Sequence, residues 1–215
     1  NISNFISSIS RADIALSVTL TGLTTLASPI VTPLNFTFWG DLLHGTRQFR
    51  LQFELSYIDM LRTVLLLLVV PLALGIAFKK RFPKSTTAIE KPLRILSLLL
   101  LMGFIGVALY NNFEAFQKYL YVAFVLVLVH NASAIAIGYA TGKVARLDTA
   151  MRRTLAIETG IQNSGLALII IFNFFEGNGG MAIIAAWWGV WHILSGLVLA
   201  GLFRTADGAQ VGVFR

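Results

Sequence analysis

The sequence predicts an all-α integral membrane protein, and three observations lead to this prediction. Of the 215 residues, 56% are hydrophobic and 13% are charged, with a mean hydropathy of +0.76, whereas soluble domains carry about 25% charged residues. Several nearly uncharged runs approach the roughly 20 residues that a helix needs to cross the hydrocarbon core of a bilayer. Basic residues gather at the ends of these runs, so topology explains the net charge of +7 and no nucleic-acid partner is expected. The chain has no cysteine, which excludes a disulfide framework and a thiolate metal site.

The first 36 residues predict a half-helix followed by a span. Apolar residues at helical spacing favour a half-helix over 1–12, which is too short to cross a bilayer. Residues 14–34 form the first span, which is uncharged but carries a stripe of hydroxyl side chains. Such a stripe, taken alone, is typical of closely packed membrane helices. Pro29 and Pro33 are expected to fray the far end of this span.

The rest of the sequence predicts five more spans, giving six spans and one half-helix in total. Residues 37–57 are expected to form an outer connector on the membrane surface. The spans are expected over about 61–78, 95–110, 119–142, 154–175 and 181–203, with a tail over 205–215. Pro71 is expected to kink the first of these five. The basic loops 79–94 and 143–153 are placed in the cytoplasm with the C-terminus, which predicts a multi-pass protein of the inner (plasma) membrane.

The segment from Glu158 to Gly165 places a carboxylate and two side-chain amides inside an otherwise apolar run. A carboxylate there costs a few kcal/mol, so it normally faces a cavity, a partner or an ion. Glu158 and Gln162 are four residues apart and share one helix face, and Gly160 weakens the helix between them. The segment therefore predicts an ion site on a broken helix at mid-membrane. A polar seam between packed helices, with Glu158 protonated or bonded to a neighbour, is the alternative at this point.

Two further groups of polar or aromatic residues lie inside the expected spans. His130 fits either a hydrogen-bonded packing residue or part of a proton or substrate path. The cluster of Trp187, Trp188, Trp191 and His192 favours an aromatic belt at the membrane interface over a cation cage.

The stretches around Ser3-Asn4 and Gln162-Asn163 have the same anatomy, because each combines a short polar break with a half-helix. Interrupted segments at corresponding positions of two halves indicate an inverted-repeat transporter with its site at the midplane. Residues 58–204 then form one five-helix repeat, and residues 1–36 form the end of its partner. On this repeat logic we expect about three and a half further helices before residue 1.

Specific residues carry a resemblance to a known family along the whole chain. They are Ser3-Asn4, Asp13-Ile14-Ala15-Leu16-Ser17, Thr21, Thr24, Leu26-Ala27-Ser28-Pro29, Thr32-Pro33-Leu34, His130-Asn131, Gly138-Tyr139, Gly142 and Glu158-x-Gly-x-Gln-Asn-Ser-Gly-Leu. With them the sequence resembles the bile acid:sodium symporter family. The resemblance implies ten helices in two inverted repeats, divided into a core and a panel, with two crossed discontinuous helices at the centre. It also implies two sodium ions behind the crossing and an organic anion between core and panel.

The resemblance implies the following site residues. One sodium ion would use Ser3, Asn4, Ser17, Thr21 and Glu158, and the second would use Glu158, Gln162, the carbonyls of Thr159 and Ile161, and a glutamine from an earlier helix. Asn163 and the start of the half-helix at Asn1 would face the substrate, with His130 as a further candidate. Hydroxyl, amide, carbonyl and carboxylate oxygens suit a hard cation. The family often has Thr-Ala where this chain has Asn1-Ile2, which leaves the identity of the substrate open.

The expected function is sodium-coupled symport of an organic anion by alternating access, with a bile-acid-like compound or a small carboxylate such as pantoate as the substrate. The sequence shows no nucleophile–base pair and no nucleotide loop, so we do not expect an enzyme. The bilayer and the organic anion are the expected partners, and no protein partner is predicted. Three alternatives remain: a proton-coupled carrier in which Glu158 titrates, a sodium-independent exporter of the same architecture such as an arsenite or auxin-type carrier, and a non-transporting membrane sensor fragment.

Overall fold

The computed structural model describes residues 2–42, 57–111 and 113–212, and every regular element within these ranges is a helix. The predicted half-helix is α1 (Ile2–Ile9), and it is followed by α2 (Ile14–Leu42). The next crossing consists of α4 (Tyr57–Val64), the π-helical turn η1 (Leu65–Val69) and α5 (Val70–Arg81). The chain continues through α6 (Pro83–Asn111), α7 (Phe113–Val144), α8 (Thr149–Gly160), α9 (Ser164–Phe174) and α10 (Gly179–Gly212).

Five helical stretches in the described part of the chain are long and apolar enough to cross a membrane. They are Ile14–Leu42, Tyr57–Arg81, Tyr121–Val144, Thr149–Phe174 and Gly179–Ala206. The all-α membrane class is therefore confirmed. The span expected over 95–110 lies within α6. The structure does not describe several side chains of this helix, so the span remains a prediction.

The prediction that Pro29 and Pro33 fray the first span was wrong. Helix α2 continues through both prolines to Leu42, so it also takes up the first residues of the expected connector 37–57. The ring of Pro29 removes the N–H that would bond to the carbonyl of Thr25. Ser28 replaces that donor, because its Oγ donates to Thr25 O at 2.9 Å. A neighbouring hydroxyl is a common way to repair a proline inside a membrane helix. Residues 43–56 of the connector lie outside the described residues.

The disruption expected at Pro71 takes the form of the π turn η1, which ends two residues before it, at Val69. A wider turn of this kind separates the proline ring from the carbonyl one turn earlier.

The predicted loops are shorter than expected, because the basic segments mostly belong to helix ends. Between α5 and α6 only Phe82 is not helical, and its N–H still bonds to Phe78 O at 2.8 Å. Residues 79–94 therefore belong to the end of α5, the single linking residue Phe82 and the first turns of α6, and not to a loop. Between α7 and α8, Asp148 caps α8 by accepting the N–H of Met151, so the helix starts within the expected loop 143–153.

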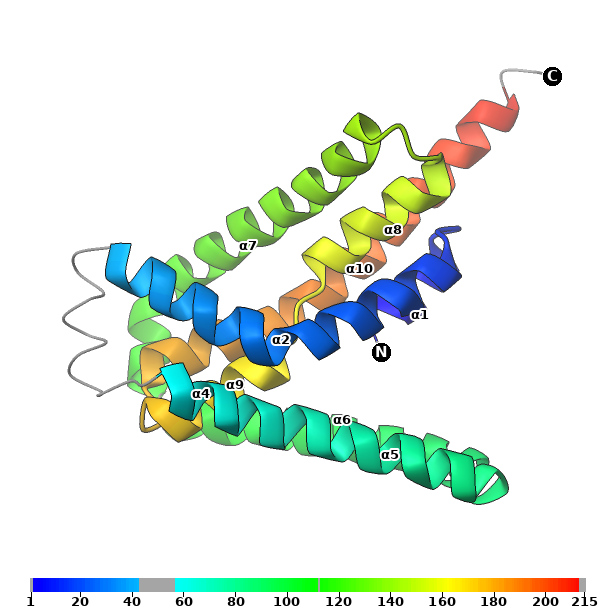
Figure 1. Ribbon diagram of the computed structural model, residues 1–215. Coiled ribbons are helices and arrows are strands. Elements are labelled where there is room, and N and C mark those ends of the chain that lie inside the picture. The colour runs from blue at the N-terminus through cyan, green and yellow to red at the C-terminus, as the bar shows by residue number, and fades with distance from the viewer. Residues whose placement is uncertain (1, 43–56, 112, 213–215) are drawn as a thin grey trace.

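The basic turns lie together at one end of the molecule. Figure 1 shows the α5–α6 turn, the α7–α8 turn and the C-terminal part of α10 on the right, with the α9–α10 turn on the left. This arrangement agrees with the alternation of spans that the charges predicted.

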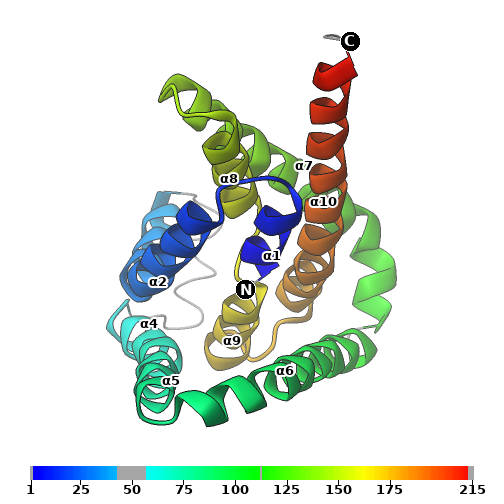
Figure 2. The same cartoon turned by 90° about the vertical axis from the view of Figure 1, so that its right-hand side faces the viewer.

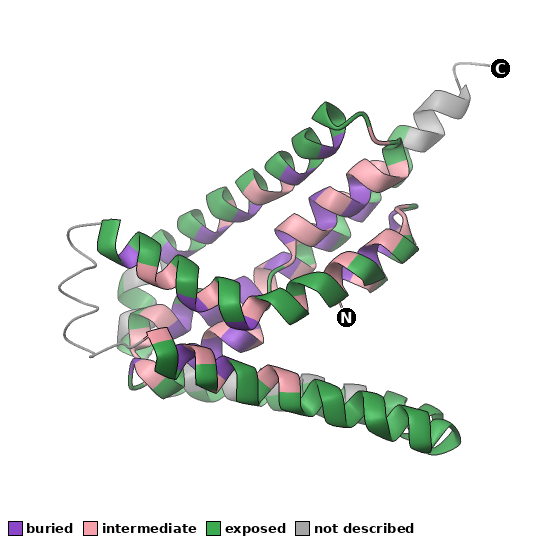
Figure 3. Ribbon diagram, viewed as in Figure 1, coloured by how far each residue is buried: buried purple, intermediate pink, exposed green. Residues whose placement is uncertain are grey.

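Burial is concentrated where α1, α8, α9 and α10 meet, as the colouring in Figure 3 shows. The short helix α1 lies between α8 and α10 in Figure 2, and Ile6 of α1 packs with Ile157 of α8 and Ala200 of α10. By contrast, α2 and α5 expose many large apolar side chains, as expected for helices that face lipid. The packing thus places the half-helix next to the broken helix.

Candidate functional site

The helix carrying Glu158 is broken, as the sequence predicted. Helix α8 ends at Gly160, Ile161 is extended with φ −97° and ψ 103°, and α9 begins at Ser164. Asn163 caps the new helix, because its Oδ1 accepts the N–H of Leu166 at 3.1 Å. The break exposes backbone groups at mid-span that can serve as ligands.

A buried asparagine holds the end of α8 at this break. Asn131 of α7 is 1% exposed, and its Nδ2 donates to Gly160 O at 2.8 Å. Gly160 is also in close contact with α7, since a Cβ there would lie 2.5 Å from Ile135 Cγ1. Asn131 satisfies a carbonyl that the broken helix leaves without a backbone donor.

Sequence reasoning selected the neighbour, His130, and missed Asn131. Consecutive helical residues point in different directions, and His130 is exposed with its ring against Trp188 at a centroid distance of 4.7 Å. An amide in the middle of an apolar span was the signal that could have identified Asn131. The structure does not bring His130 into the group of oxygen atoms around Glu158.

Five of the predicted sodium ligands meet at the carboxylate of Glu158, where α1, α2 and α8 come together. Ser17 Oγ lies 2.5 Å from Glu158 Oε1, and Thr21 Oγ1 lies 3.0 Å from Oε2. Asn4 Oδ1 lies 2.8 Å from Ser17 Oγ and 3.3 Å from Thr21 Oγ1. Ser3 Oγ completes the group at 3.3 Å from Thr21 Oγ1. We call these five residues the oxygen cluster.

The oxygen cluster has more close oxygen pairs than protons to bridge them. Five oxygen–oxygen contacts join its members, and only the hydroxyls of Ser3, Ser17 and Thr21 carry a proton when Glu158 is ionised. Ser3 and Ser17 are buried, at 2% and 0% exposed, and Asn4, Thr21 and Glu158 are half-buried. Since buried lone pairs without donors are costly, the cluster is suited to a cation.

The donor set favours a hard cation. It consists of one carboxylate, one amide and three hydroxyls, which are all oxygen ligands. Within the described part of the chain there is no group of three or more His, Asp or Glu side chains that could hold a metal ion. This composition suits sodium better than a transition metal, which prefers imidazole or thiolate.

The residues predicted for the second sodium ion are not gathered in the same way. Gln162 is exposed, and its Nε2 donates to Thr159 O at 2.6 Å, so it engages one of the carbonyls assigned to that ion. Thr159 Oγ1 bonds to Leu155 O within α8. Ile161 lies in the extended break. The second set remains a prediction.

Of the two asparagines predicted to face the substrate, the structure describes Asn163 but not Asn1. Asn163 is exposed at the start of α9, although its Oδ1 is engaged as the cap. Asn1 lies outside the described residues, directly before α1. Their role toward a substrate remains a prediction.

The tryptophan cluster packs in part against the protein. Trp188 is 9% exposed and His192 is 3% exposed, while Trp187 and Trp191 are half-buried. Trp187 and Trp191 both contact the ring of Phe124 on α7, at centroid distances of 5.6 and 5.7 Å. The cluster therefore helps to join α10 to α7, and its place at the membrane interface remains a prediction.

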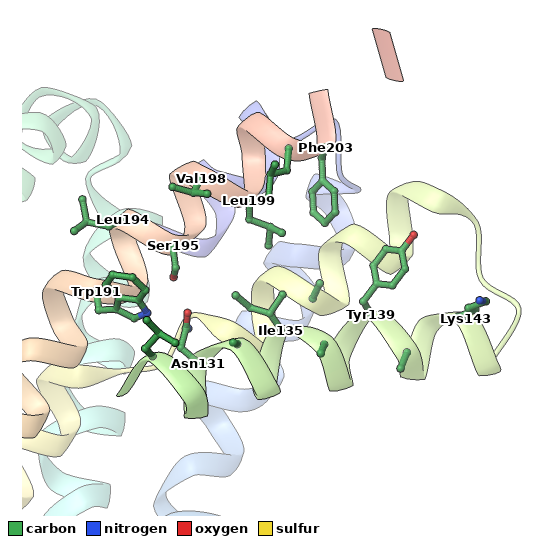
Figure 4. A pocket seen from close by; sticks show the side chains of 16 residues that line it. Asn131, Ile135, Tyr139, Lys143, Trp191, Leu194, Ser195, Val198, Leu199 and Phe203 are labelled. Atoms are coloured by element: carbon green, nitrogen blue, oxygen red, sulfur yellow. The ribbon is translucent and has the colours of Figure 1, made fainter. Parts of the chain in front are cut away.

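A groove of about 680 Å³ runs between α7 and α10 (Figure 4). Its lining is almost entirely apolar, with Asn131 toward one end and Lys143 at the other. None of the residues of the oxygen cluster lines this groove. It is separate from the candidate ion site.

Comparison with known proteins places the chain in a family. The profile of the Sodium Bile acid symporter family matches residues 1–118. The uncharacterized sodium-dependent transporter YocS of Bacillus subtilis is 28% identical over 92% of this chain and 58% of its own length. The probable sodium/metabolite cotransporter BASS1 of Arabidopsis thaliana is 28% identical over 97% of this chain and 50% of its own length. Sodium/bile acid cotransporter 5 of Mus musculus is 32% identical over 75% of this chain and 36% of its own length. The chain thus spans about half the length of the curated relatives it matches.

Proposed function

Because this chain belongs to the sodium bile acid symporter family, we propose that it forms part of a secondary transporter that couples sodium to the movement of an organic anion. The family and the relatives are transporters and not enzymes, in agreement with the sequence. The observation that carries the proposal is the shortage of protons in the oxygen cluster around Glu158.

Sodium would be bound where three helices meet. Ser3 and Asn4 lie on α1, Ser17 and Thr21 on α2, and Glu158 on α8. A cation shared by these oxygens would neutralise the carboxylate and draw the three helices together. The positions of α1 and of the break after α8 would then depend on whether sodium is bound.

An anionic substrate is supported by the two half-helices. Helix α9 begins inside the span Thr149–Phe174, α1 packs against α8 of the same span, and the N-terminal end of a helix carries a partial positive charge. In inverted-repeat transporters such ends point toward anionic groups of the substrate. Coupling would arise because the anion binds better to the sodium-bound arrangement than to the empty one.

Proton coupling at the same residue is the second candidate. A protonated Glu158 would add a fourth proton to the oxygen cluster and could donate it to one of the neighbouring oxygens. Sodium-independent transport with a steep dependence on pH would favour this candidate.

Topology is proposed from the basic helix ends. The chain is a multi-pass membrane protein, and we place the α5–α6 turn, the α7–α8 turn and the C-terminus on the cytoplasmic side of the plasma membrane. Labelling of single cysteines introduced at Lys84 and Glu176 with an impermeant reagent would test this. Glu176, in the α9–α10 turn, should react from outside intact cells and Lys84 should not.

Uptake into membrane vesicles tests the function. The complete protein is assayed with labelled pantoate and with a labelled bile salt, with and without a sodium gradient. Sodium-dependent uptake of either anion that is lost in Glu158→Gln would support the proposal. Export without sodium, or ligand binding without flux, would instead favour the exporter or the sensor.

A further inference from the structure

Beside the oxygen cluster, a second polar contact joins α2 to α8, and it involves the corner between α1 and α2. Thr154 of α8 is fully buried. Its Oγ1 accepts the N–H of Asp13 at 2.9 Å and lies 3.0 Å from Asp13 O and 3.1 Å from Ala150 O, to either of which it can donate. The Asp13 N–H also approaches Ala150 O at 3.4 Å. A single hydroxyl thus engages both backbone polar groups of Asp13.

Asp13 lies directly before α2, which begins at Ile14. Its side-chain Oδ1 accepts the N–H of Leu16 at 2.9 Å, which makes it the cap of the helix that carries Ser17 and Thr21. Fixing the backbone of Asp13 therefore fixes the first turn of α2.

The other side of the corner is also held by α8. Arg153 is 6% exposed and donates from Nη1 to Ser10 O at 3.4 Å, and its guanidinium lies over the ring of Phe203 at 5.1 Å. Ser10 directly follows α1, the helix that carries Ser3 and Asn4. A cation at the C-terminal end of a helix is favoured by the helix dipole. Two adjacent residues of α8 thus contact the ends of both helices that supply ligands.

The spacing links this corner to the oxygen cluster. The Asp13–Thr154 contact and the Ser17–Glu158 contact join residues that are both 141 positions apart in sequence. Asp13 and Ser17 are four residues apart on one helix, and Thr154 and Glu158 are four apart on the other, which is about one turn in each case. The two contacts therefore lie one helical turn apart and have the same sequence offset between α2 and α8.

We propose that Thr154 is a positioning residue for the sodium site, acting through the backbone of Asp13. By holding the first turn of α2 against α8, Thr154 fixes the position of α2 along the axis of α8, and with it the position at which Ser17 and Thr21 face Glu158. The ligand oxygens then already lie close to the carboxylate before sodium binds. Less binding free energy is therefore lost in ordering them. This inference rests on the proposed function, because it assigns Thr154 to the affinity for sodium.

The test uses the complete protein with Thr154→Val, which keeps the shape and removes the hydroxyl, and with Thr154→Ser, which restores it. Thr141→Val is the matched control, because Thr141 is exposed and its Oγ1 bonds only to Ile137 O of its own helix. Equilibrium binding of radioactive sodium to purified protein gives the affinity. Hydrogen exchange of the peptide covering residues 10–16, measured without sodium, reports on the corner itself.

Thr154→Val should weaken sodium binding by about three- to tenfold, the range expected for one or two lost hydrogen bonds, and should speed exchange at the corner. The maximal transport rate at saturating sodium should stay within twofold. Thr154→Ser should restore both values, and Thr141→Val should change neither.

The proposal is overturned if Thr154→Val binds sodium within twofold of the unchanged protein, or if Thr154→Ser is as impaired as Thr154→Val. If the unchanged protein binds no sodium, the proposed function fails. The exchange measurement then still decides whether Thr154 holds the corner, and unchanged exchange in Thr154→Val overturns that part as well.

Discussion

Glu158 and Ser17 lie 141 residues apart in sequence, yet Ser17 Oγ is 2.5 Å from Glu158 Oε1. The contact joins the broken helix α8 to the hydroxyl-bearing helix α2. Ser17 is completely buried and Glu158 is half-buried, so the Ser17 hydroxyl is shielded from water while the carboxylate is shielded in part. Because an ionised carboxylate in a membrane protein requires compensation, this contact marks the part of the molecule where a cation is most needed.

Replacing Glu158 should remove sodium dependence. Glu158→Gln keeps the shape of the side chain but not its charge, and an interaction with a charged group contributes about 1.5–3 kcal/mol, or roughly ten- to a hundredfold in affinity. The measurement is sodium-dependent uptake in vesicles. Glu114→Ala is the control, because Glu114 is exposed in the first turn of α7. Equal losses in the two variants would remove Glu158 from the site.

The hydroxyl side chains of α2 should contribute differently to sodium binding, depending on whether they point toward Glu158. Thr21→Val removes an oxygen that lies 3.0 Å from Glu158 Oε2, and we expect the half-saturating sodium concentration to rise about tenfold, equivalent to about 1–1.5 kcal/mol. Thr24→Val should have little effect, since Thr24 is exposed and its Oγ1 bonds to Leu20 O within its own helix. Similar shifts for Thr21 and Thr24 would indicate that the stripe serves helix packing and not ion binding.

Replacing Asn131 should lower the stability of the protein, because Asn131 holds the end of α8 at the break. Asn131→Leu leaves Gly160 O without its donor, and an unsatisfied buried group costs about 1–3 kcal/mol. We expect a lower midpoint of thermal unfolding in detergent. Asn173→Leu is the control, because the Asn173 amide is exposed and bonds only to Ile169 O in its own helix. An unchanged midpoint for Asn131→Leu would show that its bond to the break contributes nothing to stability.

The close approach of α7 to α8 should not tolerate a methyl group at Gly138. A Cβ there would lie 2.5 Å from Leu155 O and 2.7 Å from Thr159 Oγ1, so Gly138→Ala must push α7 away from α8, at a cost of about 1–3 kcal/mol. At Gly75 a Cβ would meet nothing within 4 Å, and Gly75→Ala should be neutral or slightly stabilising. Thermal unfolding of both variants checks this, and equal midpoints would contradict the close approach.

Local patterns in the sequence were sufficient for the helices and for the break. Hydropathy over about 20 residues identifies a span wherever it occurs, because the bilayer imposes the same length on every crossing helix. The break after Gly160 was predictable for a similar reason, since the glycines and amides that end the helix are adjacent in the chain. Misjudged details, such as the end of α2 beyond Pro33, depended on whether a neighbouring group such as the Ser28 hydroxyl repairs the backbone.

The sequence by itself thus determined the membrane class, the broken helix and, through the family resemblance, a set of oxygen-bearing residues. Only the tertiary structure decided how they face one another. Ser17, Thr21 and Thr24 look alike in the hydroxyl stripe, and it is the packing of α2 against α8 that turns the first two toward Glu158. The same applies to Asn131 and His130, which are neighbours in sequence but lie on different faces of α7. Side-chain direction relative to another helix depends on contacts between distant residues, and no local pattern encodes it.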